Sequence, residues 1–148
     1  MGLDMYLIRK IYLETNNKKL EPLFYKDDEG KLIPVGVDQE KIKEITEDRI
    51  YWRKANSIHD WFVRNVQDNN DDCGTYYVTR EDLKALFDEC EKVLKNPELA
   101  STVLPTKSGF FFGNYDYDED YFEDITYTRN KLKEILDIEN DKGYSSSW

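Results

Sequence analysis

The stretch with the greatest influence on the fold is Tyr51-Trp52-Arg53-Lys54-Ala55-Asn56-Ser57-Ile58-His59-Asp60-Trp61-Phe62-Val63. It holds two of the three tryptophans, the single histidine and an adjacent Arg-Lys pair. Spacings of three and four residues predict one helix over residues 52–66. Its apolar face would carry Trp52, Ala55, Asn56, His59, Phe62, Val63 and Val66. Its opposite face would carry Arg53, Ser57, Asp60, Arg64 and Gln67.

Strands are predicted on the N-terminal side of this helix. Residues 3–14 alternate between apolar and charged side chains, which is typical of a strand. Residues 31–37 form a second short apolar run after the turn signal of residues 27–30, and Pro34 restricts that run to an edge or irregular position. Residues 40–51 lack a clean helical stripe, so a strand leading into Tyr51 and Trp52 is favoured over a helix.

On the C-terminal side, residues 68–72 end the helix in a polar loop, and residues 76–78 resemble a short strand. Thr79 is a good N-cap with Asp82 three residues later, so a helix is predicted from there until just before Pro97. A short turn follows around residues 99–100.

The run Gly109-Phe110-Phe111-Phe112-Gly113 is predicted to be a strand or a tight loop. A last helix should extend from near Tyr117 to about Ile138, because apolar residues recur along one face of it. Residues 143–148 are expected to form a flexible tail.

These elements predict an α+β protein with a single domain over residues 1–148. A small, mostly antiparallel sheet would combine the N-terminal half with Phe110–Phe112, and three main helices would cover it. A chain of 148 residues is long enough to bury one sizeable core. The 7 Phe, 11 Tyr and 3 Trp supply bulk for that core, although charged residues make up 35% of the chain.

The charge balance constrains the class of partner. There are 31 acidic residues against 21 Lys and Arg, which gives a formal net charge of −10. Such a chain is disfavoured for direct nucleic-acid binding, and a protein with a basic surface suits it better. The N-terminus lacks a signal-peptide pattern, and no apolar run approaches the ~18 residues of a membrane span. Two cysteines without metal-ligand spacing complete the expectation of a reduced protein in the cytoplasm.

Two groups of residues are candidates for a site. The first is a ligand-binding set in the predicted helix, in which Trp52 would stack, Arg53 and Lys54 would neutralise an anion, and Asn56 and His59 would contact the ligand. The alternative for Asn56 and His59 is a structural role, with both side chains hydrogen-bonded in the core. This alternative is favoured, because the chain has a single histidine and the sequence shows no nucleophile signature for it to serve.

The second candidate is an acidic and aromatic surface at the start of the last helix. Six acids occur among the nine residues 116–124 with no basic residue between them. The predicted partner-binding residues are Tyr115, Asp116, Tyr117, Asp118, Glu119 and Asp120, since tyrosine is common at interface hot spots. An ordinary acidic first turn of a helix is the alternative. The calcium-loop pattern fails in every register, so no metal, cofactor or catalytic residue is predicted.

Three blocks of sequence resemble a family of small uncharacterised proteins carried by tailed bacteriophages and by prophages of their hosts. The blocks are Met1–Leu7, then Tyr51–Asn56 with Ile58-His59 and Trp61–Val63, then Leu104–Thr106 with Ser108–Gly113. Asp71-Asp72-Cys73 and the acidic, Tyr-rich stretch before the last helix add to the resemblance. It implies a phage origin and a location in the cytoplasm of the bacterial host, without implying a mechanism.

The hypothesis favoured by these observations is a non-enzymatic accessory protein that binds a host protein with a basic surface, in the manner of a counter-defence inhibitor. The alternative is a small-molecule pocket for a nucleotide-like anion, built around Trp52–His59. A structural component of a phage assembly is a third class. The residues indicate no membrane partner and do not determine the oligomeric state.

Overall fold

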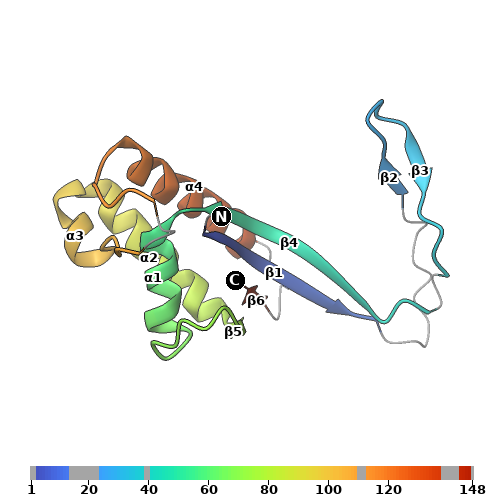
Figure 1. The fold of residues 1–148 in the computed structure, drawn as a ribbon, viewed down its shortest axis with the longest axis horizontal. Coiled ribbons are helices and arrows are strands. Elements are labelled where there is room, and N and C mark those ends of the chain that lie inside the picture. Colours follow the sequence, from blue (N-terminus) through green and yellow to red (C-terminus); the bar gives the residue numbers. More distant parts are fainter. Residues whose placement is uncertain (1–2, 14–23, 39–40, 110–112, 138–143, 148) are drawn as a thin grey trace. The chain divides into compact units, whose positions relative to one another are not determined.

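The computed structural model describes residues 3–13, 24–38, 41–109, 113–137 and 144–147 (Figure 1). Contacts cluster in two compact units, which we call the main unit (Met1–Arg9 with Glu47–Trp148) and the hairpin unit (Lys10–Thr46). The α+β class predicted from the sequence is confirmed. The elements, in chain order, are β1 (Asp4–Tyr12), β2 (Phe24–Lys26), β3 (Leu32–Pro34), β4 (Glu44–Arg53), α1 (Asn56–Asn65), β5 (Thr75–Val78), α2 (Arg80–Lys95), the 3₁₀ turn η2 (Pro97–Leu99), α3 (Ala100–Val103), α4 (Glu119–Leu136) and β6 (Tyr144–Ser147).

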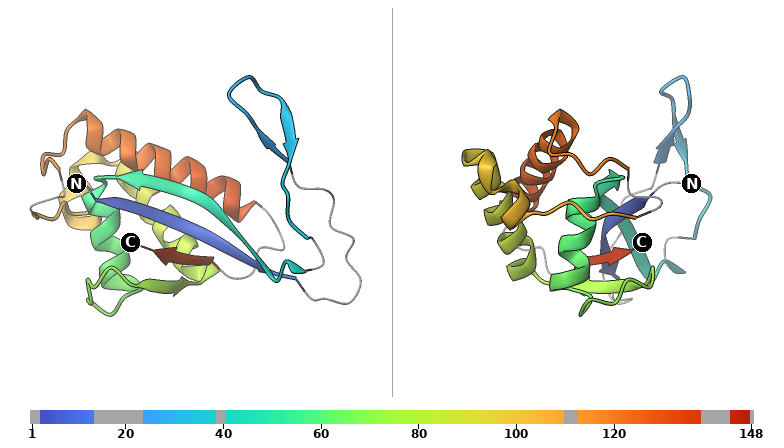
Figure 2. Two further views of the ribbon diagram at one scale, coloured as in Figure 1. Left: turned by 45° about the vertical axis from the view of Figure 1, so that its right-hand side comes forward. Right: turned by 60° about the vertical axis from the view of Figure 1, so that its left-hand side comes forward.

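The main sheet has the strand order β4-β1-β6-β5 (Figures 1 and 2). β6 pairs antiparallel with β1, where Ser147 lies opposite Tyr6, and antiparallel with β5, where Ser147 lies opposite Thr75. Residues 144–147 are therefore a strand between two others, and the expectation of a flexible tail is wrong for them. Backbone hydrogen bonds to two strand edges hold such a strand in a sheet. The predicted contribution of Phe110–Phe112 to the sheet lies outside the described residues.

One face of the sheet packs on the helices. Met5 and Leu7 of β1 and Ile50 and Trp52 of β4 alternate along their strands and are buried. They form one cluster with apolar residues of the helices, among them Ile58, Phe62, Leu83, Leu86, Ile125 and Leu132. Figure 2 shows that the three main helices α1, α2 and α4 lie on the same side of the sheet. In the described part of the chain, no helix is both long and apolar enough to cross a membrane.

The start of α1 differs from the prediction. The helix begins at Asn56, and Trp52 belongs to β4, where it faces inwards like Ile50. A corner at Lys54, with φ of 60°, separates the strand from the helix. The predicted start of the helix was wrong because the inward-facing residues at the end of a strand can continue the apolar stripe of the helix that follows.

The burial of α1 also differs from a simple amphipathic helix. Every residue from Asn56 to Val63 is buried, including Ser57 and Asp60 of the face predicted to lie opposite the apolar one. Lys107 contacts that face through an ion pair with Asp60, at 3.2 Å between Nζ and Oδ1. The segment after α3 therefore covers the polar side of α1.

The two longer helices begin at side-chain caps. Thr79 and Asp82 form a complete capping box at the start of α2, as predicted. Asp118 caps α4 by accepting a hydrogen bond from the Tyr121 backbone N–H. α4 is joined to β4 in the core, because the Trp52 indole N–H donates to Thr128 Oγ1 at 2.8 Å.

The hairpin unit contains the β2–β3 hairpin, whose register places Tyr25 opposite Ile33. Asp27 Oδ1 accepts hydrogen bonds from the backbone N–H groups of Glu29 and Lys31, and Gly30 adopts a φ of 81° in the predicted turn. Pro34 lies at an edge, as predicted, because the sheet has only two strands.

Candidate functional site

The corner between β4 and α1 forms one wall of the candidate site. Lys54 N–H donates to the carbonyl of Leu3, which fixes the end of β4. Gly113 approaches this corner closely: a Cβ on Gly113 would lie 3.3 Å from the Cβ of Lys54. Gly113 also has a φ of 80°, so both its conformation and its surroundings favour glycine.

Asn56 connects the corner to the segment between α3 and α4. Its Nδ2 donates to the carbonyl of Asn114 at 2.8 Å, and its Oδ1 accepts from the backbone N–H of Lys107 at 3.0 Å. One buried amide thus holds two points of a segment that has no helix or strand of its own in its described residues. The Asn56 side chain thus links the start of α1 to this segment.

The same segment is also tied to itself and to α4. Thr106 Oγ1 donates to the carbonyl of Tyr115 at 2.8 Å, and the Tyr117 hydroxyl accepts from the backbone N–H of Thr106 at 3.2 Å. The buried Tyr121 hydroxyl of α4 donates to the carbonyl of Leu104 at 2.8 Å. These bonds set the position of the segment against the N-terminal end of α4.

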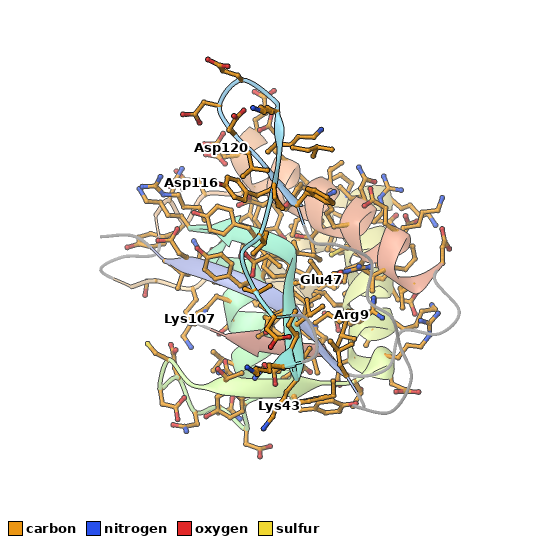
Figure 3. All side chains as sticks on the ribbon, turned by 90° about the vertical axis from the view of Figure 1, so that its right-hand side faces the viewer. Arg9, Lys43, Glu47, Lys107, Asp116 and Asp120 are labelled. Atoms are coloured by element: carbon orange, nitrogen blue, oxygen red, sulfur yellow. The ribbon has the colours of Figure 1, made fainter. Side chains whose placement is uncertain are left out.

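A pocket of about 420 Å³ lies between the corner, this segment and the first turns of α4. Its volume falls in the range of small-molecule and side-chain sites. Asp116 and Asp120, labelled in Figure 3, both line this pocket. The lining residues are Arg53, Lys54, Asn56, Ser57, Thr106, Gly113, Asn114, Asp116, Asp118, Asp120, Tyr121, Glu123 and Asp124.

The pocket has two oppositely charged walls. Arg53 and Lys54 come from the corner, and five carboxylates come from α4 and the residues just before it, namely Asp116, Asp118, Asp120, Glu123 and Asp124. Among the residues that the structure describes, none of these seven side chains forms an ion pair within 4 Å. The pocket thus holds side chains of both charges that form no ion pair with one another among the described residues.

Asp124 is the carboxylate most affected by this environment. Partial burial, followed by the charges of Asp120, Glu123 and Asp118, raises its pKa to about 6. Asp118 differs, because its carboxylate accepts hydrogen bonds from the Tyr121 N–H and from Nδ2 of Asn114. The acidic wall therefore consists of one helix cap and several carboxylates that repel one another.

The structure separates the predicted ligand-binding residues into two groups. Arg53, Lys54 and Asn56 line the pocket. Trp52 is only 3% exposed and donates its indole N–H to Thr128, so neither face of its ring is available to a ligand. His59 is 1% exposed, and its Nε2 lies 2.9 Å from Oδ2 of Asp71, outside the pocket.

The predicted partner-binding residues also divide into some that line the pocket and some that do not. Asp116, Asp118 and Asp120 line the pocket, whereas Glu119 does not. Tyr115 and Tyr117 are 47% and 38% exposed and belong to the segment that borders the pocket. The structure thus brings acidic residues of the second candidate set against basic residues of the first.

Several lining residues were absent from both predicted sets. Asp124 could have been included from the sequence, because it lies four residues after Asp120 and therefore on the same helical face. Ser57 had been assigned to the face away from the apolar stripe. Thr106 and Asn114 reach the pocket only through long-range contacts, and no local pattern marks them.

Other reactive groups lie outside this pocket. Cys73 and Cys90 are free, and burial raises the pKa of the Cys90 thiol. Within the described ranges of the chain, no group of three or more His, Cys, Asp and Glu side chains is arranged to hold a metal ion.

No protein-family model, curated protein or solved structure matches this chain. The functional argument therefore depends on the residues of the pocket.

Proposed function

We propose that this chain is a non-enzymatic binding protein whose acidic pocket receives a basic side chain of a partner protein. The observation that carries the proposal is the acidic wall, in which Asp116, Asp118, Asp120, Glu123 and Asp124 line one pocket without an ion pair among the described residues. A lysine or arginine side chain of the partner supplies positive charge to these carboxylates, with which Arg53 and Lys54 form no ion pair among the described residues. Its insertion relieves the repulsion among the carboxylates, which favours binding.

The surroundings of the pocket suit a protein partner. Tyr115 and Tyr117 expose aromatic surface next to the acidic wall, and tyrosine contributes strongly to protein interfaces. The formal net charge of −10 adds long-range attraction for a basic protein. The resemblance to phage proteins suggests a host protein as the partner, encountered in the bacterial cytoplasm, and inhibition of a defence protein as the outcome.

The alternative of a nucleotide-like anion has less support. Arg53 and Lys54 line the pocket and can bind a phosphate, but Trp52 and His59 lie outside it. Five carboxylates on the opposite wall would repel a ligand that carries only negative charge.

A capture experiment with matched variants tests the proposal. The tagged protein is incubated with lysate of a bacterial host at low and high salt, and bound proteins are identified by mass spectrometry. The pocket variant combines Asp120→Asn, Glu123→Gln and Asp124→Asn. The control variant combines Asp28→Asn, Glu29→Gln and Glu98→Gln, which makes the same change in charge at exposed positions outside the pocket.

We expect one basic protein to be captured by the wild type and the control, and to be lost from the pocket variant and at high salt. The purified partner then gives a dissociation constant for each variant. Equal affinity for the pocket variant and the control contradicts the proposal, as does the absence of any partner for the folded wild type.

A further inference from the structure

The opposite walls of the pocket lead to a more specific inference, which rests on the proposed function. We propose that the pocket recognises a bipolar group, in which a cationic nitrogen lies against the acidic wall and a carboxylate lies against Arg53 and Lys54. A ligand that carried only positive charge would make use of one wall and be repelled by the other. A bipolar group makes use of both.

The first support is the separation of the walls. Arg53 and Lys54 line the same pocket as five carboxylates, yet they pair with none of them among the described residues. Lys54 lies at a corner with φ of 60°, and Gly113 lies close to its side chain. Opposite charges kept apart across a polar space leave room for a group with both charges.

The second support is the hydroxyl of Ser57. Ser57 lines the pocket and is only 3% exposed. Its hydroxyl takes part in no hydrogen bond within the described part of the chain. Ser57 Oγ is not one of the fully enclosed polar atoms that lack a partner, so it is open to the pocket, and a polar group that fills the pocket can form a hydrogen bond with it. The acidic wall alone gives no reason for a buried hydroxyl there.

Arginine and argininamide provide a direct test, since they differ only in a carboxylate that is replaced by a neutral amide. Each is titrated into the isotopically labelled full chain, and pocket amide shifts are followed by NMR. We expect arginine to bind about tenfold more tightly, the scale of one charge-assisted hydrogen bond, although argininamide carries the greater positive charge. In a variant with Arg53→Gln and Lys54→Gln, this preference should disappear.

A second ligand pair distinguishes a free amino acid from a segment of a protein. The blocked peptides acetyl-Ala-Arg-Asp-Ala-amide and acetyl-Ala-Arg-Asn-Ala-amide differ by one side-chain carboxylate. Tighter binding of the carboxylate-bearing member in either pair supports the proposal, and the pair that shows it identifies the source. Tighter binding of the more positive member, or no binding in both pairs, overturns it.

Capture experiments with variants of each set of charged residues distinguish failure of the bipolar inference from failure of the proposed function. If removing Arg53 and Lys54 strengthens capture of a basic partner while the acidic pocket variant abolishes it, the acidic site stands and the bipolar inference fails. If capture is unaffected by the acidic variant, the proposed function fails as well. A Ser57→Ala variant should weaken arginine binding several-fold without loss of the carboxylate preference, which separates the hydroxyl from the basic wall.

Discussion

Replacing Asp124 by Asn should stabilise the protein near neutral pH. Asp124 lies on α4 beside Asp120 and Glu123, and partial burial with these negative neighbours raises its pKa to about 6. Asp116 and Asp118 of the preceding segment share the pocket, and Arg53 and Lys54 face it from the corner without pairing. At pH 7 the native state therefore holds a carboxylate that its surroundings disfavour, and asparagine has the shape of the neutral form.

The sign and size of this change in the free energy of unfolding follow from the protons that the Asp124 carboxyl binds in the unfolded and the native state. Below about pH 3.8 the carboxyl is protonated in both the unfolded and the native chain. Between this value and about 6 the unfolded state loses its proton first, so the free energy of unfolding decreases as pH rises. At about 1.4 kcal/mol per pH unit the total cannot exceed about 3 kcal/mol, and screening by solvent at a partly exposed group reduces it to about 1–2 kcal/mol.

Urea unfolding followed by tryptophan fluorescence, at intervals from pH 4 to pH 8, measures the effect. The free energy of unfolding of Asp124→Asn should equal that of the wild type at about pH 4, and its excess over the wild type should reach its full value above about pH 6. Glu119→Gln is the matched control, because it removes the same charge from the first turn of α4 outside the pocket. We expect the control to lose a few tenths of a kcal/mol through the helix dipole. A gain for Asp124→Asn that does not change with pH would refute the reasoning.

Two further predictions concern the contacts that build the site. Asn56→Ala leaves the Lys107 N–H and the Asn114 carbonyl without this partner, so it should lower the free energy of unfolding in urea by about 2–3 kcal/mol. The control Asn65→Ala loses one bond to the Trp61 carbonyl and should lower it by less than about 1 kcal/mol. Equal losses for the two variants would show that Asn56 does not hold the segment. Thr128→Val leaves the Trp52 indole N–H unpaired in the core and should cost about 1–3 kcal/mol more than Thr128→Ser, which keeps the acceptor. A valine variant as stable as the serine variant would contradict this bond.

Local signals predicted much of the fold. The capping box of Thr79 and Asp82, the turn at Gly30 and the apolar stripe of α4 each lie within a few consecutive residues, so the sequence alone shows them. The start of α1 was wrong because Trp52 satisfies the helical spacing and the strand alternation at once. β6 was missed because its pairing with β1 and β5 depends on distant backbone groups.

The candidate site was predicted in parts that the sequence could not join. Arg53 and Asp120 are far apart in the chain, and long-range contacts such as the Asn56 bridge, the bonds around Thr106 and the Trp52–Thr128 bond bring their segments together. Polar residues on an amphipathic helix usually face water, yet a covering segment buries Ser57 and Asp60. Such coverage is a property of tertiary contacts, which no spacing rule contains.

The position of β6 determines when the sheet can be completed during synthesis. β1 leaves the ribosome first and β5 follows, but the strand that joins them comes after α4 in the chain. Until residues 144–147 emerge, the nascent protein carries two open strand edges, which are templates for aggregation. The helices α2 and α4, which pack on each other, can form before that point. Completion of the main sheet therefore has to wait until the chain beyond α4 has been made, and slow synthesis of residues 144–147 prolongs the period in which the chain is exposed to misassembly.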